Sequence, residues 1–211
     1  MAKFIVTGEQ HFGIDGQMLE IKRQLRLKSG SPIDPESVAL ALQDVVEGRF
    51  SKKKANSILK LISKGELLLI DAINGKETLA QAEDIFPSGI SFDFKKWETD
   101  QPGDATEETP VQVYEMTQDA TFAQMFGSLG TDLDKLYLTQ HQIKNFCKKY
   151  PDWLRSDGFA TFFPFKVEEQ YFVAVVRVCG GGLFVGVRRL GHGNIWGAGR
   201  RRRVVVPQLA A

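Results

Sequence analysis

The feature that most constrains the fold of this chain is a pair of strand-like runs in its last third. Residues 159–167 and 170–178 are rich in aromatic and β-branched residues and are separated only by Glu168 and Glu169. Runs of this composition, joined by so short a polar connection, are typical of an antiparallel hairpin. The last third of the chain is therefore predicted to be built on a sheet.

The hairpin is predicted to continue into a larger sheet. Three glycines, Gly180–Gly182, supply a turn into a third strand at 183–190, and the branched residues at 202–206 predict a fourth strand. One helix laid on this antiparallel four-stranded meander would bury one face of the strands. The expected core residues are Phe163, Phe165, Phe172, Ala174 and Val176, and Pro164 is expected to place the first strand near a sheet edge.

The helix expected on that sheet begins after Thr139. Thr139 and Gln142 have the spacing of a capping box, and Pro151 ends the helix. The apolar face is predicted to carry Ile143, Phe146, Cys147 and Tyr150, and the solvent face Lys144, Lys148 and Lys149.

The first third reads as a helical part with one short strand. One helix is expected at 17–27, and a second starts at Asp34 as cap and Pro35 as first residue, with Ile33 packing on Val38, and runs to about residue 47. A third helix is predicted from Ser51 to Gly65, after the short glycine-containing turn Gly48-Arg49-Phe50, and a buried strand at 66–70.

The middle of the chain predicts a short helix at 78–86 and strands at 90–94 and 111–116. Residues 99–110 contain no aliphatic side chain larger than alanine and read as an acidic Pro/Gly linker. The expected class is α+β, with a mostly helical part at 1–98, the linker at 99–110 and a C-terminal α+β domain at 111–211.

Composition excludes a disordered chain and offers no membrane-spanning stretch. Hydrophobic residues make up 43% and charged residues 25% of the 211 residues, which is ordinary for a packed protein. The longest apolar run, 172–176, is far shorter than a membrane span. A cytoplasmic protein without a membrane partner is expected, and Cys147 and Cys179 are expected to be buried thiols.

The net charge of +1 hides a strong segregation of charge along the sequence. Residues 66–134 carry 3 basic and 15 acidic side chains, whereas residues 135–211 carry 13 basic and 4 acidic ones. Either the acidic middle packs against the basic end, or the basic end serves an anionic partner. The sequence leaves both interpretations open.

Two clusters of positive charge are candidate contacts for nucleic acid. Ser51, Lys52, Lys53 and Lys54 are expected to start a helix, where three lysines conflict with the positive end of the helix dipole and a bound phosphate would relieve the conflict. Arg200, Arg201, Arg202 and Arg203 enter the last predicted strand. Because a strand alternates its faces, half of these arginines are expected to point to each face of the sheet.

The other chemistry-bearing residues predict neither a cofactor nor a metal site. His11, His141 and His192 are scattered and lack metal-ligand spacing, although His192 with Asp157 could be imagined as an acid–base pair. Gly180–Gly182 follow a strand without a following helix, so they do not predict a phosphate loop. The aromatic residues of the predicted sheet could stack bases, but such residues are more often core.

Three classes of function follow from these features. The first is a non-enzymatic cytoplasmic protein that binds DNA or RNA through the lysine helix start and the arginine strand. The second is a protein-interaction module whose basic face is neutralised by its own acidic middle. The third is a hydrolase-like enzyme, which would require His192, His141 or Cys147 to meet a carboxylate in one cleft.

The chain also resembles a family of proteins through several local motifs. The stretch from Val113 to Lys166, with Trp153-Leu-Arg155 and Asp157-Gly-Phe159, and the terminal Val-Val-Pro-Gln-Leu are similar to a recurrent family of uncharacterised proteins from candidate-phylum bacteria. The early stretch LKSGSPIDPESVALALQDVVEGRF resembles a segment of similar proteins. This resemblance implies no activity, ligand or catalytic residue.

Overall fold

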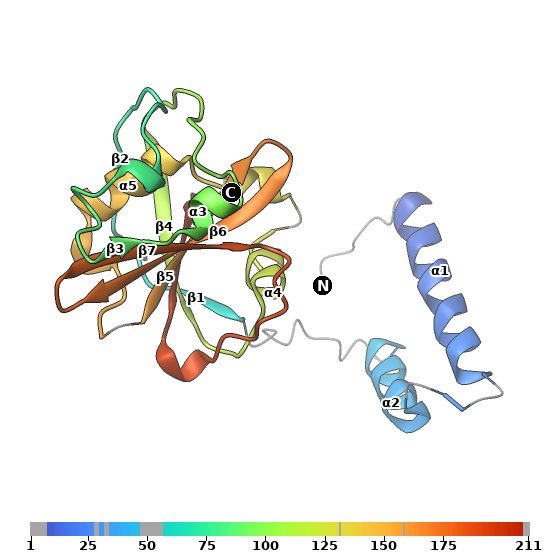
Figure 1. Ribbon diagram of the computed structural model, residues 1–211. Coiled ribbons are helices and arrows are strands. Elements are labelled where there is room, and N and C mark those ends of the chain that lie inside the picture. The colour runs from blue at the N-terminus through green and yellow to red at the C-terminus, as the bar shows by residue number, and fades with distance from the viewer. Residues whose placement is uncertain are drawn as a thin grey trace. The chain divides into compact units, whose positions relative to one another are not determined.

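The chain forms two compact units, residues 1–55 and residues 56–211 (Figure 1). The structure is a computed structural model that describes residues 8–27, 30–31, 34–46, 57–130, 132–157 and 159–208. The division between the units therefore lies before residue 56 and not at the predicted linker 99–110.

The described residues of the first unit form the helices α1 (Gly8–Leu25) and α2 (Pro35–Val46). Asp34 caps α2 because its carboxylate accepts hydrogen bonds from the backbone N–H groups of Glu36 (3.3 Å) and Ser37 (3.0 Å). This confirms the predicted start of the helix. The predicted packing of Ile33 on Val38 lies outside the described residues.

The second unit is built on one mixed sheet, which confirms the α+β class. Its strand order is β1-β4-β8-β5-β6-β7-β3, and β2 also pairs with β4. The pairs β5–β8 and β3–β7 are parallel, and the others are antiparallel. The strands of the described residues are β1 (Leu59–Leu61), β2 (Leu68–Ile70), β3 (Gly89–Ile90), β4 (Thr109–Met116), β5 (Ala160–Val167), β6 (Gln170–Cys179), β7 (Gly182–Arg189) and β8 (Arg203–Pro207).

Strands β5, β6 and β7 form the two predicted hairpins, but the predicted fourth strand does not extend them. Val167 pairs with Gln170 around the first turn, and Cys179 pairs with Gly182 around the second. β8 lies between β4 and β5, so the meander has three strands and not four. Val204, Val205 and Val206 are all buried, as expected of a central strand that is covered on both faces.

The central position of β5 contradicts the prediction that Pro164 marks an edge strand. β5 pairs with β8 only at Thr161 and Phe162, so the missing N–H of Pro164 removes no bond to β8. The carbonyl of Pro164 instead accepts a hydrogen bond from the backbone N–H of Leu138, at 2.9 Å. The proline is tolerated because the ladder with β8 has already ended.

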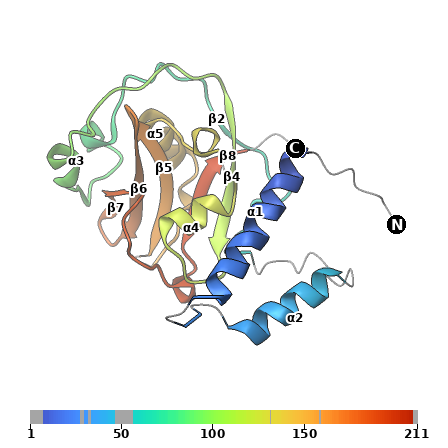
Figure 2. The same cartoon turned by 90° about the vertical axis from the view of Figure 1, so that its right-hand side faces the viewer.

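The two faces of the sheet carry separate hydrophobic cores. The helix α5 (Gln140–Lys149) covers one face, and the short helix α4 (Phe122–Gly127) covers the other (Figure 2). The five predicted core residues are all buried under α5. The α4 core contains Phe162, whose ring meets that of Phe122 edge-on at 5.0 Å between centroids.

The helix α5 forms as its sequence predicts. The Thr139 hydroxyl accepts from the backbone N–H of Gln142, the Gln142 side chain accepts from the N–H of Thr139, and Pro151 follows the last helical turn. Cys147 is buried on its apolar face. Cys179, at the end of β6, is exposed, so the prediction of a buried thiol is wrong there.

Three predicted elements take another form. Residues 59–61 of the predicted helix 51–65 are strand β1, because Leu59 pairs with Met116 of β4. The predicted helix 78–86 is reduced to the single 3-10 turn η1 (Leu79–Gln81). The predicted strand 90–94 ends at Ile90, and the chain then enters the short helix α3 (Asp93–Lys96).

The predicted linker 99–110 is part of the second unit. Thr106 and Ile73 exchange backbone hydrogen bonds of 2.8 and 2.9 Å, and the N–H of Gly103 donates to the carbonyl of Gly75. Thr99 is fully buried, and its carbonyl accepts from the side chain of Gln140 at 2.7 Å. Backbone and side-chain hydrogen bonds therefore hold a segment that has no large apolar side chain of its own.

Candidate nucleic-acid interface

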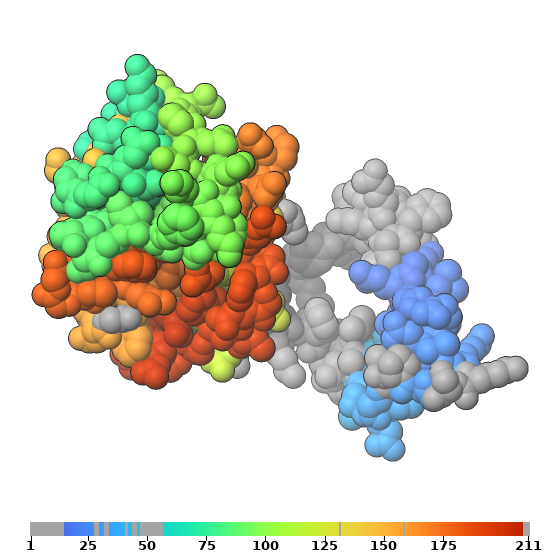
Figure 3. Space-filling model, viewed as in Figure 1, coloured from blue at the N-terminus to red at the C-terminus, as the bar shows by residue number. Residues whose placement is uncertain are grey.

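Of the two predicted contacts for nucleic acid, the structure describes only the arginine run. Ser51, Lys52, Lys53 and Lys54 lie outside the described residues. Arg200 and Arg201 lie in and after the 3-10 turn η4 (Ala198–Arg200), and Arg203 begins β8. Figure 3 shows the C-terminal segment, coloured red, at the surface of the second unit.

The topology of the sheet brings two more arginines to this run. β8 is parallel to β5, so both strands begin at the same end of the sheet, and the antiparallel β6 ends there. Arg203 pairs with Thr161, and the neighbouring Ala160 pairs with Arg177. Arg155, five residues before β5, lies at this same end of the sheet. We call Arg155, Arg177 and Arg200–Arg203 the arginine edge.

Arg202 and Arg203 turn to opposite faces of the sheet, as the alternation of a strand predicts. The alternation predicted for Arg200 and Arg201 does not apply, because these two residues lie in and after the turn η4 and not in a strand. Nη1 of Arg203 donates to the carbonyls of Asp152 (3.1 Å) and Leu154 (3.3 Å), on the side covered by α5. Nη1 of Arg202 donates to the carbonyl of Gly197, and its guanidinium lies 5.1 Å from the ring centre of Trp196, in the other core. Both guanidinium groups are thus held in place by neutral partners.

Arg200 and Arg155 share one aromatic ring. Their guanidinium carbons lie 4.8 and 5.6 Å from the ring centre of Phe159, and Nε of Arg155 donates to the carbonyl of Arg200. Arg201 has a left-handed backbone, with φ of 47°, and its side chain is exposed. A non-glycine residue in this conformation costs of order 1 kcal/mol, and such strain is often found at functional sites.

The electrostatics of the arginine edge are those of crowded positive charge. Burial lowers the pKa of Arg202, and the neighbouring Arg200 and Arg177 lower it further. Burial likewise lowers the pKa of Arg203, with Arg155 adding to the effect. Asp119 and Glu115 act in the opposite direction. Because arginine stays protonated in proteins, the guanidinium groups keep their positive charges in spite of this repulsion.

Within the described residues, Arg177 and Arg200–Arg203 form no ion pair, and Arg155 has only a 3.9 Å contact with the exposed Asp157. Several of the other basic side chains in residues 135–211 behave differently. Lys149 pairs with Asp71 (2.6 Å), Lys166 with Asp134 (3.2 Å) and Arg188 with Asp93 (2.8 Å). The acidic middle of the chain therefore neutralises several basic side chains, but it leaves the arginine edge unpaired.

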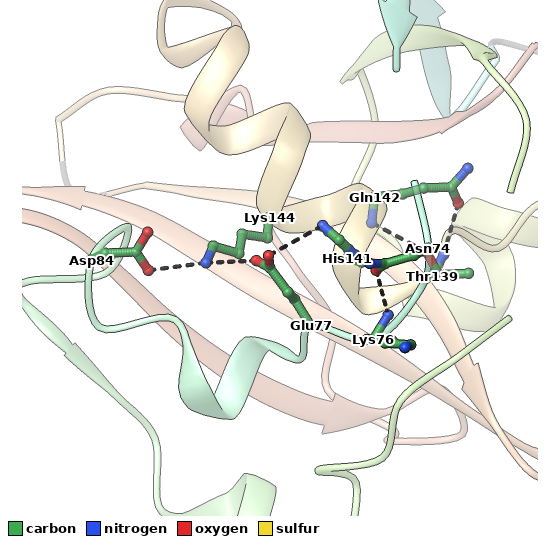
Figure 4. Close-up of polar contacts among 8 residues, drawn as sticks. All are labelled: Asn74, Lys76, Glu77, Asp84, Thr139, His141, Gln142 and Lys144. Atoms are coloured by element: carbon green, nitrogen blue, oxygen red, sulfur yellow. Dashed lines mark hydrogen bonds and ion pairs between the residues drawn. The ribbon is translucent and has the colours of Figure 1, made fainter. Parts of the chain in front are cut away.

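A second polar cluster joins α5 to the segment around η1 (Figure 4). Nζ of Lys144 lies 2.8 Å from Glu77 and 3.1 Å from Asp84, so this lysine is not turned to solvent as predicted. Nε2 of His141 lies 3.8 Å from Glu77. These side chains, with Asn145 and Lys148, line a pocket of about 210 Å³. Nδ1 of His141 and Oδ1 of Asn145 are buried without a hydrogen-bond partner in the described structure.

This cluster brings together the histidine and carboxylate that a hydrolase would need, but no serine, threonine or cysteine is among the described residues that line its pocket. Cys147 lies on the buried face of α5, where burial raises the pKa of its thiol, and a protonated thiol is a poor nucleophile. His192 and Asp157 do not form the imagined pair: Asp157 contacts Arg155, and His192 lines a pocket with Trp97. The arrangement around Lys144 is that of an ion-pair cluster.

The Lys144 cluster predicts a measurable pH dependence of stability. The hydrogen bonds from Lys144 lower the pKa of Glu77 below its ordinary 4.5 and that of Asp84 below its ordinary 3.8. A carboxyl group with a lowered pKa stabilises the folded state above its ordinary pKa, and this stabilisation is lost as the pH falls through the folded-state value. We expect Lys144→Met to lose less stability than the wild type when urea unfolding at pH 7 is compared with unfolding near pH 3.

The matched control is Lys148→Met on the same helix. Lys148 is exposed, and its charge has the weakest effect among those on Asp84. Its substitution should leave the acid dependence close to that of the wild type. Equal acid dependence in all three proteins would show that the contacts of Lys144 with Glu77 and Asp84 do not form in solution.

Among the residues that the structure describes, no three histidine, cysteine, aspartate or glutamate side chains are grouped as metal ligands would be. Likewise, none of the described helices combines the length and the apolar character needed to cross a membrane.

Comparison with known proteins adds no relative from which a role could be transferred. No protein-family model matches the chain, and no curated protein or solved structure is similar to it. The function must therefore be argued from the arginine edge itself.

Proposed function

We propose that this protein binds nucleic acid, DNA or RNA, through the arginine edge. The observation that carries the proposal is a difference in partners. Lys149, Lys166 and Arg188 of the C-terminal part have carboxylate partners, whereas Arg200, Arg202 and Arg203 have carbonyl groups and aromatic rings. A guanidinium group fixed by neutral partners keeps its full charge and its remaining N–H donors for phosphate oxygens.

The geometry suits a phosphate backbone better than one small anion. The six arginines extend from the side of the sheet covered by α5, where Arg203 lies, to the opposite side, where Arg202 lies. A chain of phosphates can contact cations at several separate points, and such contacts position the nucleic acid without reading its sequence. The lysine helix start at 51–54 stays a predicted second contact, and the proposed binding takes place in the cytoplasm.

The test is the salt dependence of binding to labelled single-stranded and duplex oligonucleotides of random sequence. Each phosphate contact lowers log K by about 0.7 to 0.9 per unit of log salt. With three or more phosphates contacted, we expect a slope of about −2 or steeper between roughly 50 and 200 mM salt. Fluorescence anisotropy measures this directly. Inorganic phosphate at equal ionic strength should compete only weakly.

The rival function, a protein-interaction module, makes the opposite prediction. In that case the cations of the arginine edge serve only the protein's own carbonyl groups, and oligonucleotides show no binding at low salt. That result would overturn the proposal. Displacement of the oligonucleotide by heparin but not by inorganic phosphate would support it, because both polymers present a row of anions.

A further inference from the structure

A shallow pocket of about 390 Å³ lies at the end of the sheet opposite the arginine edge. It is lined by Trp97, Gln170, Tyr171, Arg189, Gly191 and His192. Tyr171 stands at the start of β6 and Arg189 at the end of β7, and the N–H of Leu190 donates to the carbonyl of Tyr171. The arginine edge meets β6 at its other end, at Arg177, so the two sites are separate.

The aromatic wall of the pocket is fixed in place. Trp97 stacks on the buried ring of Phe172, with centroids 6.4 Å apart and planes 25° apart, while part of its own surface stays exposed. It ends α3, and the next residue, Glu98, takes a left-handed backbone with φ of 54°. The N–H of Thr99 then donates to the carbonyl of Phe94, which closes the end of the helix. The ring is therefore presented by a rigid turn.

The polar groups of the pocket leave a positive charge for a ligand. Arg189 is exposed, its guanidinium lies 5.9 Å from the ring centre of Trp97, and it forms no ion pair within the described residues. Nδ1 of His192 accepts from the N–H of Asn194, so Nε2 is the nitrogen of this ring that remains for a ligand. Asp134, which accepts from the Tyr171 hydroxyl, is also paired with Lys166.

The geometry points to a binding site for a small aromatic anion. A flat ring would stack on Trp97 beside Tyr171, and its phosphate or carboxylate group would pair with Arg189, with His192 and Gln170 as further hydrogen-bonding groups. The volume lies within the range of about 300 to 1,000 Å³ that is usual for small-molecule sites. This site does not depend on the arginine edge.

The test is calorimetric titration of the full chain with four probes. Adenosine monophosphate combines a ring with a phosphate, benzoate combines a ring with a carboxylate, and adenosine and inorganic phosphate each carry one half of the recognised chemistry. We expect at least one aromatic anion to bind at least tenfold more tightly than both half-probes. Binding of adenosine monophosphate would indicate a phosphate ligand, and binding of benzoate would indicate a carboxylate ligand.

Two variants assign the binding to this pocket. Arg189→Gln should weaken the binding of the aromatic anion at least tenfold, whereas Lys64→Gln, which removes the same charge at an exposed position outside both sites, should leave the affinity unchanged. Trp97→Leu should remove the quenching of tryptophan fluorescence that the stacked ring causes. No binding of either aromatic anion at millimolar concentration, or equal loss of affinity in Arg189→Gln and Lys64→Gln, would overturn the inference. Neither outcome affects the oligonucleotide test.

Discussion

Replacing Gly75 with alanine is expected to lower the free energy of unfolding by about 3 kcal/mol, since both overpacking and a left-handed backbone oppose the new side chain. Gly75 has φ of 72°, and an added Cβ would lie 2.1 Å from the carbonyl oxygen of Asp104 and 2.5 Å from that of Gly103. These are backbone atoms, so the clash cannot be relieved by rotating a side chain. Urea unfolding at neutral pH, followed by circular dichroism, measures the change.

Gly65→Ala is the matched control for this substitution. Gly65 also has a positive φ, of 87°, but nothing lies within 4 Å of its added Cβ. Gly65→Ala should therefore lower the free energy of unfolding only by the conformational cost of a left-handed alanine, about 1 kcal/mol. If both variants lose the same stability, residues 103–104 do not pack on the turn at Gly75, and the segment 99–110 is then the free linker that its composition predicts.

The packing of residues 99–110 shows where sequence reasoning fails in this chain. The segment has no large apolar side chain, and composition alone therefore predicts a linker. What holds it is the backbone of residues 73–75, which lies about thirty positions earlier in the sequence, together with Gln140 of α5. Hydrogen bonds to a distant backbone leave no periodic signal in either partner.

The strand β1 was predicted as part of a helix for a related reason. Ile58, Leu59, Leu61 and Ile62 suit one face of a helix, and a short apolar run fits a strand equally well. The register of Leu59 with Met116 decides between the two, and this partner lies far along the chain. The hairpin of β5 and β6 was predicted correctly because its two strands are neighbours in the sequence, and its turn and pattern are both local.

Only part of the candidate site could be predicted from the sequence. Arg200–Arg203 stand out as a run, and the alternation of a strand correctly predicts that Arg202 and Arg203 point to opposite faces. Arg155 and Arg177 carry no such signal. They join the edge only because β8 enters the sheet parallel to β5, and this insertion replaced the predicted fourth strand of the meander. The wrong prediction of a four-stranded meander and the failure to predict Arg155 and Arg177 therefore have the same cause, which is the position of β8 in the sheet.

Removing three charges from the arginine edge is expected to weaken oligonucleotide binding about a hundredfold at roughly 0.1 M salt, and to flatten the salt slope by about 2. The variant is Arg177→Gln, Arg200→Gln and Arg201→Gly. All three side chains are exposed, and glycine suits the left-handed backbone of Arg201. Arg202 and Arg203 are left in place because their hydrogen bonds to carbonyl groups hold the local structure.

A control of equal charge separates a site from a general effect of net charge. Lys64, Lys76 and Lys96 are exposed in the second unit, and their replacement by glutamine changes the net charge by the same amount. If contacts at the arginine edge dominate, this control keeps most of the affinity and the original salt slope. If both variants lose affinity equally, the oligonucleotide responds to the charge of the whole protein. The crowding of Arg200, Arg202 and Arg177 would then be a cost of the fold that no ligand offsets.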